Sequence, residues 1–89
     1  MALSPEELEQ KQKELLEKAR RGVLKFVQEK GGTASLADMH DFSMNRYLIQ
    51  HQAFSQLMET MVDQKLVDYD FANSQATLTD AGRQLIAGS

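Results

Sequence analysis

The sequence contains no cysteine. This absence excludes disulfides, a thiolate nucleophile and any metal centre built on cysteine ligands. The chain also lacks an apolar run close to the ~20 residues that would cross a bilayer. Its first residues, Met-Ala-Leu-Ser-Pro-Glu-Glu, have neither the basic start nor the apolar middle of a signal peptide. We therefore expect a cytoplasmic protein, or a nuclear one if the source is eukaryotic.

The common catalytic motifs are absent as well. The sequence has no Gly-x-Ser-x-Gly elbow, no phosphate-binding glycine loop and no His-Glu-x-x-His pair. With 89 residues it is long enough for one domain and leaves little room for a substrate pocket. His40, Asp41 and His51 are the best metal ligands available, and zinc needs at least three fixed ligands. We expect no enzymatic activity, no cofactor and no metal.

Basic residues are scarce beyond the first thirty positions. Residues 1–30 hold seven Lys and Arg against six Glu, whereas residues 31–89 hold three against seven Asp and Glu, and the net charge is −3. A protein that binds nucleic acid usually carries a basic stripe. The charge distribution therefore favours a protein partner over DNA.

The pattern predicts a long helix over residues 4–30. Ser4 is a good N-cap, Pro5 suits the first helical position and Glu7 completes a capping box. Apolar residues then recur with helical spacing until Gly31-Gly32. Residues 5–14 are mostly polar, which leaves two interpretations open. They form either a solvated extension or a dimerisation arm, whose contacts would be Leu8, Leu15 and Leu16.

A helix-turn-helix region is expected over residues 35–65. Thr33-Ala34 suits a very short strand, and Ser35 with Asp38 marks the start of a helix that ends near Phe42-Ser43. The next apolar stretch allows two interpretations. It is one helix from Met44 to Gln64, or the chain breaks near Ile49-Gln50 and a third helix starts at His51.

The hydrophobic spacing changes near Leu66. Apolar and acidic residues alternate from Val67 to Phe71, and alternation returns from Gln75 to Leu78, after a turn at Ala72-Asn73-Ser74. This pattern predicts a β-hairpin over residues 66–79, with Val67, Tyr69 and Phe71 packed on the helices. Thr79 then caps a final helix over residues 79–87.

This order of elements resembles the winged helix-turn-helix superfamily, and the resemblance covers roughly residues 20–87 of one domain. Leu57 to Val67 looks like a recognition helix entering a wing strand, and Leu78-Thr79-Asp80-Ala81-Gly82-Arg83 looks like the close of the wing. The implied fold is mostly α with a small β-hairpin. The family usually has glycine at Lys65, where a left-handed backbone costs a lysine about 1–2 kcal/mol. We therefore expect this turn to be built differently.

The resemblance implies DNA binding, with the third helix in the major groove. The residues that would contact DNA are Asn45, Arg46, Gln50, His51, Gln52, Ser55, Gln56 and Lys65. The wing, however, has Asp68 and Asp70 and no Lys or Arg between Leu66 and Thr79. Further phosphate contacts would come from a dimer or from the first helix, through Lys18, Arg20, Arg21 and Lys25.

Protein binding is the competing interpretation. Four methionines share helical spacing with Tyr47 and Phe54 and form either the core or an adaptable groove for a partner helix: Met39, Met44, Met58 and Met61. Asp68 and Asp70 would suit a basic partner. The leading hypothesis is a dimeric DNA-binding regulatory protein. The alternative is an accessory module that binds another protein and not DNA.

Overall fold

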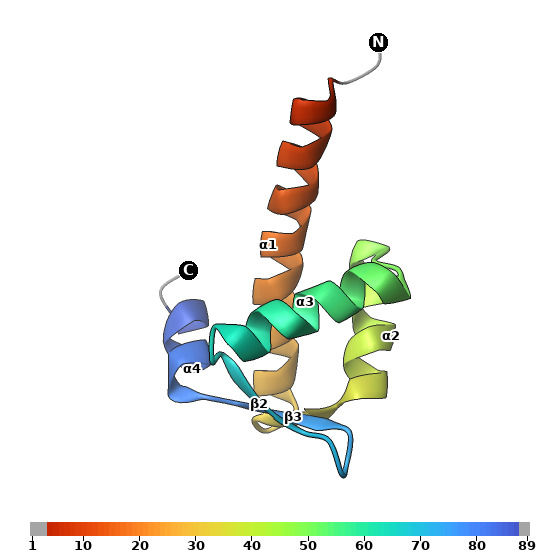
Figure 1. Ribbon diagram of the computed structural model, residues 1–89. Helices are drawn as coiled ribbons and strands as arrows, with labels where there is room; N and C mark the ends of the chain where they lie inside the picture. Colours follow the sequence, from red (N-terminus) through yellow and green to blue (C-terminus); the bar gives the residue numbers. More distant parts are fainter. Residues whose placement is uncertain (1–3, 88–89) are drawn as a thin grey trace.

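The computed structural model describes residues 4–87, which form four helices and a three-stranded antiparallel sheet (Figure 1). In chain order the elements are α1 (Pro5–Glu29), β1 (Thr33–Ser35), α2 (Leu36–Tyr47), α3 (His51–Asp63), β2 (Val67–Asp70), β3 (Gln75–Leu78) and α4 (Asp80–Ala87). The strand order is β1-β3-β2. Figure 1 shows α3 crossing α1, with α2 and α4 on opposite sides and the sheet at the carboxyl end of α1.

The first helix has two halves with different surroundings. The Ser4 hydroxyl accepts a hydrogen bond from the Glu7 N–H at 3.2 Å, which confirms the predicted cap. The carboxyl half carries Ala19, Val23, Leu24 and Val27, all fully buried. The amino half projects beyond the rest of the molecule in Figure 1. None of the helices within residues 4–87 combines the length and apolar character needed to cross a membrane.

The projecting half of α1 exposes two of the three leucines proposed as dimer contacts. Leu8 is 46% exposed and Leu15 is 43% exposed, seven residues apart and therefore on one side of the helix. Leu16 is half-buried and packs against the core of its own chain. Residues 5–15, all of them exposed, thus form an arm that precedes the first core contact of α1, at Leu16.

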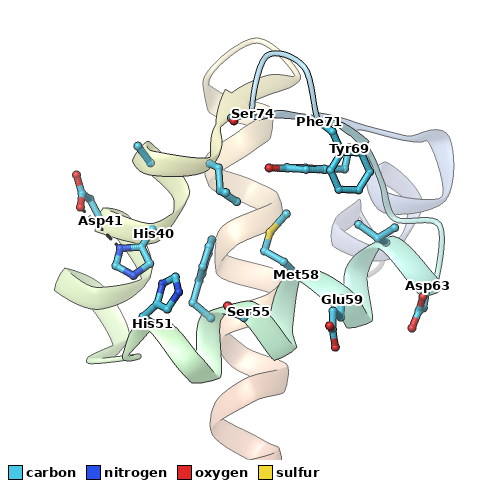
Figure 2. A pocket seen from close by; sticks show the side chains of 14 residues that line it. His40, Asp41, His51, Ser55, Met58, Glu59, Asp63, Tyr69, Phe71 and Ser74 are labelled. Carbon is cyan, nitrogen blue, oxygen red and sulfur yellow. Dashed lines mark ion pairs between the residues drawn. The ribbon is translucent and has the colours of Figure 1, made fainter.

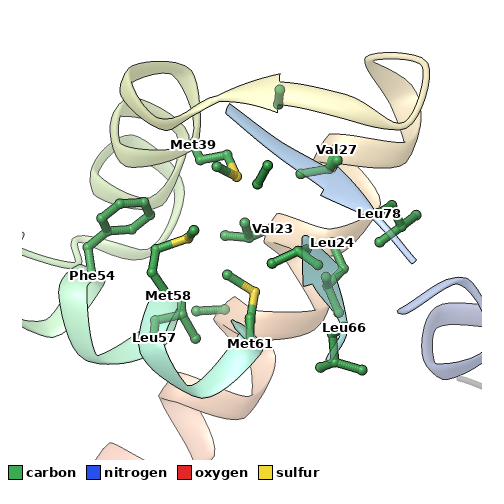
Figure 3. Close-up of a cluster of buried hydrophobic side chains, with 14 of the residues drawn as sticks. Val23, Leu24, Val27, Met39, Phe54, Leu57, Met58, Met61, Leu66 and Leu78 are labelled. Atoms are coloured by element: carbon green, nitrogen blue, oxygen red, sulfur yellow. The ribbon is translucent and has the colours of Figure 1, made fainter. Parts of the chain in front are cut away.

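The core lies between α1, α3 and the sheet (Figure 3). Met39 and Met61 are fully buried, and Met58 and Phe54 are nearly so. Three of the four methionines therefore belong to the core. The assignment of Met44 to the same face is wrong, because this side chain is 42% exposed near the end of α2.

The second helix is longer than the sequence suggested. It continues through Phe42 and Ser43 to Tyr47, so the predicted end near Phe42-Ser43 is wrong. The buried Ser43 hydroxyl donates to the Met39 carbonyl at 2.8 Å, which lets a polar residue sit inside the helix. The break near Ile49-Gln50 is confirmed, because α3 begins at His51. Leu48 takes a left-handed conformation, with φ 58°, and this conformation ends α2.

The helices α1 and α3 end in the same hydrogen-bonded motif. In each, two consecutive N–H groups donate back to carbonyls three and five residues earlier, which is the Schellman arrangement. The bonds are Gly31 to Gln28 and Gly32 to Val27 in α1, and Lys65 to Val62 and Leu66 to Met61 in α3, all 2.9–3.0 Å long. Lys65 has φ 58°. The expectation of a differently built turn is therefore wrong, and lysine occupies the left-handed position itself.

The hairpin forms as expected, with one correction. Strand β3 pairs with β2 on one side and with the short strand β1 on the other. Phe71, however, lies in the turn and is 85% exposed, so its predicted packing on the helices is wrong. The strand ends at Asp70 because the Asp70 carboxylate accepts the N–H groups of Ala72 and Asn73 at 3.0 and 3.3 Å. Val67 is buried and Tyr69 is half-buried.

The last helix approaches the α3–β2 turn closely. Thr79 caps α4 by accepting the Gly82 N–H at 3.1 Å, and its hydroxyl donates to the Lys65 carbonyl at 2.6 Å. A Cβ at Gly82 would overlap the Leu66 carbonyl oxygen and lie 2.7 Å from Cδ1 of Leu78. Glycine at this position is therefore required by the contact between α4 and the turn.

Candidate nucleic-acid interface

Seven of the eight predicted DNA-contacting residues gather where α2 ends and α3 begins. We call this surface the α3 corner, and all seven of its residues are exposed: Asn45, Arg46, Gln50, His51, Gln52, Ser55 and Gln56. Lys65 lies beyond the opposite end of α3, about 20 Å away along a 13-residue helix. Lys65 is therefore not part of the corner.

The corner is polar and contains no carboxylate. The first turn of α3 has no acidic residue, and Gln50 makes no side-chain capping bond. The amino end of a helix carries a partial positive charge, which favours anions. Amide side chains can pair with adenine, and arginine with guanine or phosphate. In chemical terms, the corner can present hydrogen-bond donors and acceptors to base edges and one guanidinium to a phosphate.

The wing, defined as β2, β3 and the turn between them, is acidic, in contrast to the α3 corner. Asp68 and Asp70 are exposed, and residues 66–79 contain no Lys or Arg. Hydrogen bonds from the side chain and backbone of Asn73 lower the pKa of Asp70 below its usual value, with a further contribution from the Ala72 N–H. The wing therefore keeps its negative charge and is unsuited to holding a phosphate backbone.

Of the four cations of α1 that were predicted to contact phosphate, only Arg20 contacts the α3 segment, at its carboxyl end. Lys18, Arg21 and Lys25 are exposed, at positions opposite to the buried stripe that packs in the core. Arg20 is half-buried, and its guanidinium donates to the Gln64 side chain at 3.0 Å, at the carboxyl end of α3. Phosphate contacts from the first helix therefore stay a prediction, with Lys18, Arg21 and Lys25 as the cations that are free of α3.

The two histidines meet across the junction of α2 and α3 (Figure 2). The His40 and His51 ring centroids are 5.5 Å apart, and His40 also lies edge-on to Phe54 at 5.1 Å. Nδ1 of His40 is 4.0 Å from the Asp41 carboxylate. Among residues 4–87 no three His, Asp or Glu side chains are grouped as metal ligands. The spacing of His40 and His51 in the sequence did not reveal that their rings meet, because this contact depends on the angle between α2 and α3.

Comparison with known proteins identifies the fold. No protein-family model matches the sequence, and no curated protein matches it either. Among solved structures the chain is similar to F93 from STIV, described as a winged-helix DNA-binding protein. The match has a TM-score of 0.61 at 16% identity and covers 74% of this chain and 76% of F93. The chain therefore has the winged-helix fold, mostly α with a small antiparallel sheet, as its sequence pattern indicated.

Proposed function

We propose that this chain is a DNA-binding regulatory protein of the cytoplasm that contacts bases through the α3 corner and acts as a homodimer. The observation that carries the proposal is the composition of the corner. Seven exposed polar side chains lie at the amino end of the helix that winged-helix proteins insert into the major groove, and none is acidic. The similarity to a winged-helix protein described as DNA-binding supports the same proposal.

The α3 corner suggests how bases would be contacted. Gln52 and Gln56 are four residues apart and therefore lie on one side of α3. In the major groove their amides would pair with adenine, and Arg46 would bind a phosphate or a guanine. Asp68 and Asp70 keep the wing away from the phosphate backbone. DNA contact is therefore limited to a short footprint for each protomer.

A dimer would double every contact. The arm of residues 5–15 exposes Leu8 and Leu15, and we assign it to pairing with a second copy. Deleting residues 1–14 is expected to convert the dimer to a monomer, measured by light scattering. The double variant Leu8→Ser/Leu15→Ser is the finer test, because it keeps the helix. An unchanged mass in both variants would exclude the arm as the contact.

The test of DNA binding is a titration against random-sequence duplex by fluorescence anisotropy, first at low and then at moderate salt. Because each protomer offers few cations near the corner, the logarithm of affinity should fall with the logarithm of salt with a shallow slope, about −2 to −4 for a dimer. The absence of binding at low salt would refute the proposal.

Two sets of variants locate the contact. Gln52→Ala/Gln56→Ala should weaken binding to a selected site by about 1–3 kcal/mol for each lost base pairing. Gln84→Ala, an exposed glutamine on α4, is the matched control and should bind as the parent does. Asp68→Lys/Asp70→Lys should raise non-specific affinity if the wing lies near a backbone. No change would place the wing elsewhere.

A further inference from the structure

A groove separates α3 from the wing and shares only His51 and Ser55 with the α3 corner. It has a volume of about 750 Å³ and lies between α2, α3 and the β2–β3 hairpin (Figure 2). We call it the α3–wing groove. Its apolar lining comes from all three elements: Leu36, Phe54, Met58, Val62, Tyr69 and Phe71. It runs along α3 from His51 to Asp63.

Phe71, an aromatic residue that lines the groove, is mostly exposed to solvent. Phe71 is 85% exposed and makes an edge-to-face contact with Tyr69, with ring centroids 4.6 Å apart. Val62 is also exposed. A large aromatic residue held at the mouth of an apolar groove is typical of a surface that binds another protein.

The groove is lined by three carboxylates and by no Lys or Arg. The carboxylates belong to Asp41, Glu59 and Asp63, which are exposed. The other titratable side chains that line it are His40, His51 and Tyr69. The rim is therefore negative, and a phosphate backbone placed here would be repelled. An occupant with positive charges would be attracted.

We propose that the α3–wing groove binds a short amphipathic helix of another protein, with large apolar side chains on one face and Lys or Arg beside them. The apolar floor accommodates the hydrophobic face, and the three carboxylates pair with the cations. The groove follows 13 residues of α3, or about 20 Å, which matches a helix of about four turns. This proposal does not depend on DNA binding by the α3 corner.

The arm of a second copy fits the groove less well. Residues 5–15 carry four glutamates and two lysines, so a rim of carboxylates would repel this segment. In the arm only one lysine, Lys11, lies beside Leu8 and Leu15, three residues after the first and four before the second. Charge complementarity therefore points to a different protein.

The probe is a synthetic amphipathic helix of about four turns, with leucine on one face and lysine on the other. Binding to the full chain is measured by fluorescence anisotropy, and amide resonances in an NMR titration locate it. We expect saturable binding that shifts resonances from 36–41, 55–63 and 69–74. A peptide with glutamate in place of each lysine should bind at least about tenfold more weakly, because it meets the same carboxylates.

Matched variants test the apolar and the acidic parts separately. Phe71→Ser should weaken the leucine–lysine peptide by about tenfold, the loss expected for a central aromatic contact. Leu48→Ser is the control, since Leu48 is equally exposed, at 84%, and lies outside the groove. Glu59→Gln/Asp63→Asn should weaken binding, whereas Asp38→Asn/Asp80→Asn, also outside the groove, should not.

Four results would overturn the proposal. They are no saturable binding of the leucine–lysine peptide, equal binding of the glutamate peptide, unchanged affinity in Phe71→Ser, and resonance shifts confined to the α1 arm. A fifth is a shift, on adding random-sequence duplex DNA, of the resonances of 36–41, 58–63 and 69–74, which lie outside the α3 corner; the groove would then be a nucleic-acid surface. Thermal unfolding of each variant separates loss of binding from loss of fold.

Discussion

The two ends of α3 are held in different ways. At the carboxyl end, Lys65 closes the helix, and its carbonyl accepts the Thr79 hydroxyl at 2.6 Å. Gly82 lies directly against the Leu66 carbonyl, so α4 covers this turn. At the amino end, Leu48 closes α2 with its side chain 84% exposed, and Gln50 has no side-chain capping bond. Ile49 is buried in the core, and the Leu48 and Ile49 N–H groups donate to the Met44 and Ser43 carbonyls at 3.0 and 3.3 Å.

The carboxyl end of α3 is therefore held by the rest of the fold, whereas its amino end is available to ligands. Both turns contain a non-glycine residue with φ 58°, a conformation that is costly for either residue. At Lys65 the cost is offset by contacts with α4. At Leu48 the side chain is exposed, and the surface beside it is the α3 corner. Variants at the two ends of α3 should therefore differ in their effect on the free energy of unfolding.

Gly82→Ala should have the largest effect. The new methyl group would overlap the Leu66 carbonyl, and overpacking of this kind costs about 1–3 kcal/mol of unfolding free energy. Urea unfolding gives the value. Gly31→Ala is the control, because a Cβ there meets nothing within 4 Å and only the left-handed backbone, at φ 92°, is penalised. A Gly82→Ala protein as stable as the parent would contradict the close approach of α4.

Thr79→Val should cost about 1–2 kcal/mol, because it removes the helix cap and the hydrogen bond to Lys65 together. The same measurement on Gln50→Ala, at the amino end of α3, should show a change within about 0.5 kcal/mol. Equal losses in the two variants would mean that the two ends are supported alike.

Lys65→Gly and Leu48→Gly should each raise the unfolding free energy by about 0.5–1 kcal/mol, because glycine adopts a positive φ without steric cost. Lys30→Gly is the matched control and should lower stability, since Lys30 has φ −82°. A loss of stability in Lys65→Gly would show that its side chain contributes more than its backbone costs.

The smallest expected effect is the contribution of the Asp70 carboxylate to the free energy of unfolding, and it changes only in acid. Its folded pKa is depressed, so its contribution to stability is present above the unfolded pKa, near 4, and is lost as pH falls through the lower folded value. Between about pH 5 and pH 3 the parent should therefore lose more stability than Asp70→Asn. Urea midpoints at both pH values measure the difference, and parallel curves would contradict it.

Local signals in the sequence were sufficient for most of the fold. Ser4, Ser35 and Thr79 cap the helices that they were expected to cap, because a hydroxyl three residues before a free N–H acts within one turn. The change of spacing at Leu66 located the hairpin, because strands and helices differ in period. Each of these features depends on neighbours within a few residues.

Features that depend on distant residues were missed. The sequence left open whether the helix breaks near Ile49-Gln50, because no glycine stands at Leu48 to mark a helix end. Phe71 has the right spacing for the strand face, yet the Asp70 carboxylate starts the turn one residue earlier. The α3–wing groove combines Leu36 of α2 with Met58 of α3 and Tyr69 of β2, and periodicity cannot predict that meeting. The residues of the α3 corner are nearly consecutive, so their common exposure at one end of α3 follows from neighbouring positions, while their contact with DNA stays a prediction.

The position of β2 at the edge of the sheet has a consequence for solubility. An edge strand offers unpaired N–H and C=O groups to another such strand, and this pairing is how β proteins aggregate. Asp68 and Asp70 place two negative charges along that edge, so two copies that approach edge to edge repel each other. The same acidic pair that makes the wing unfit for a phosphate backbone therefore also disfavours edge-to-edge pairing of two copies through β2.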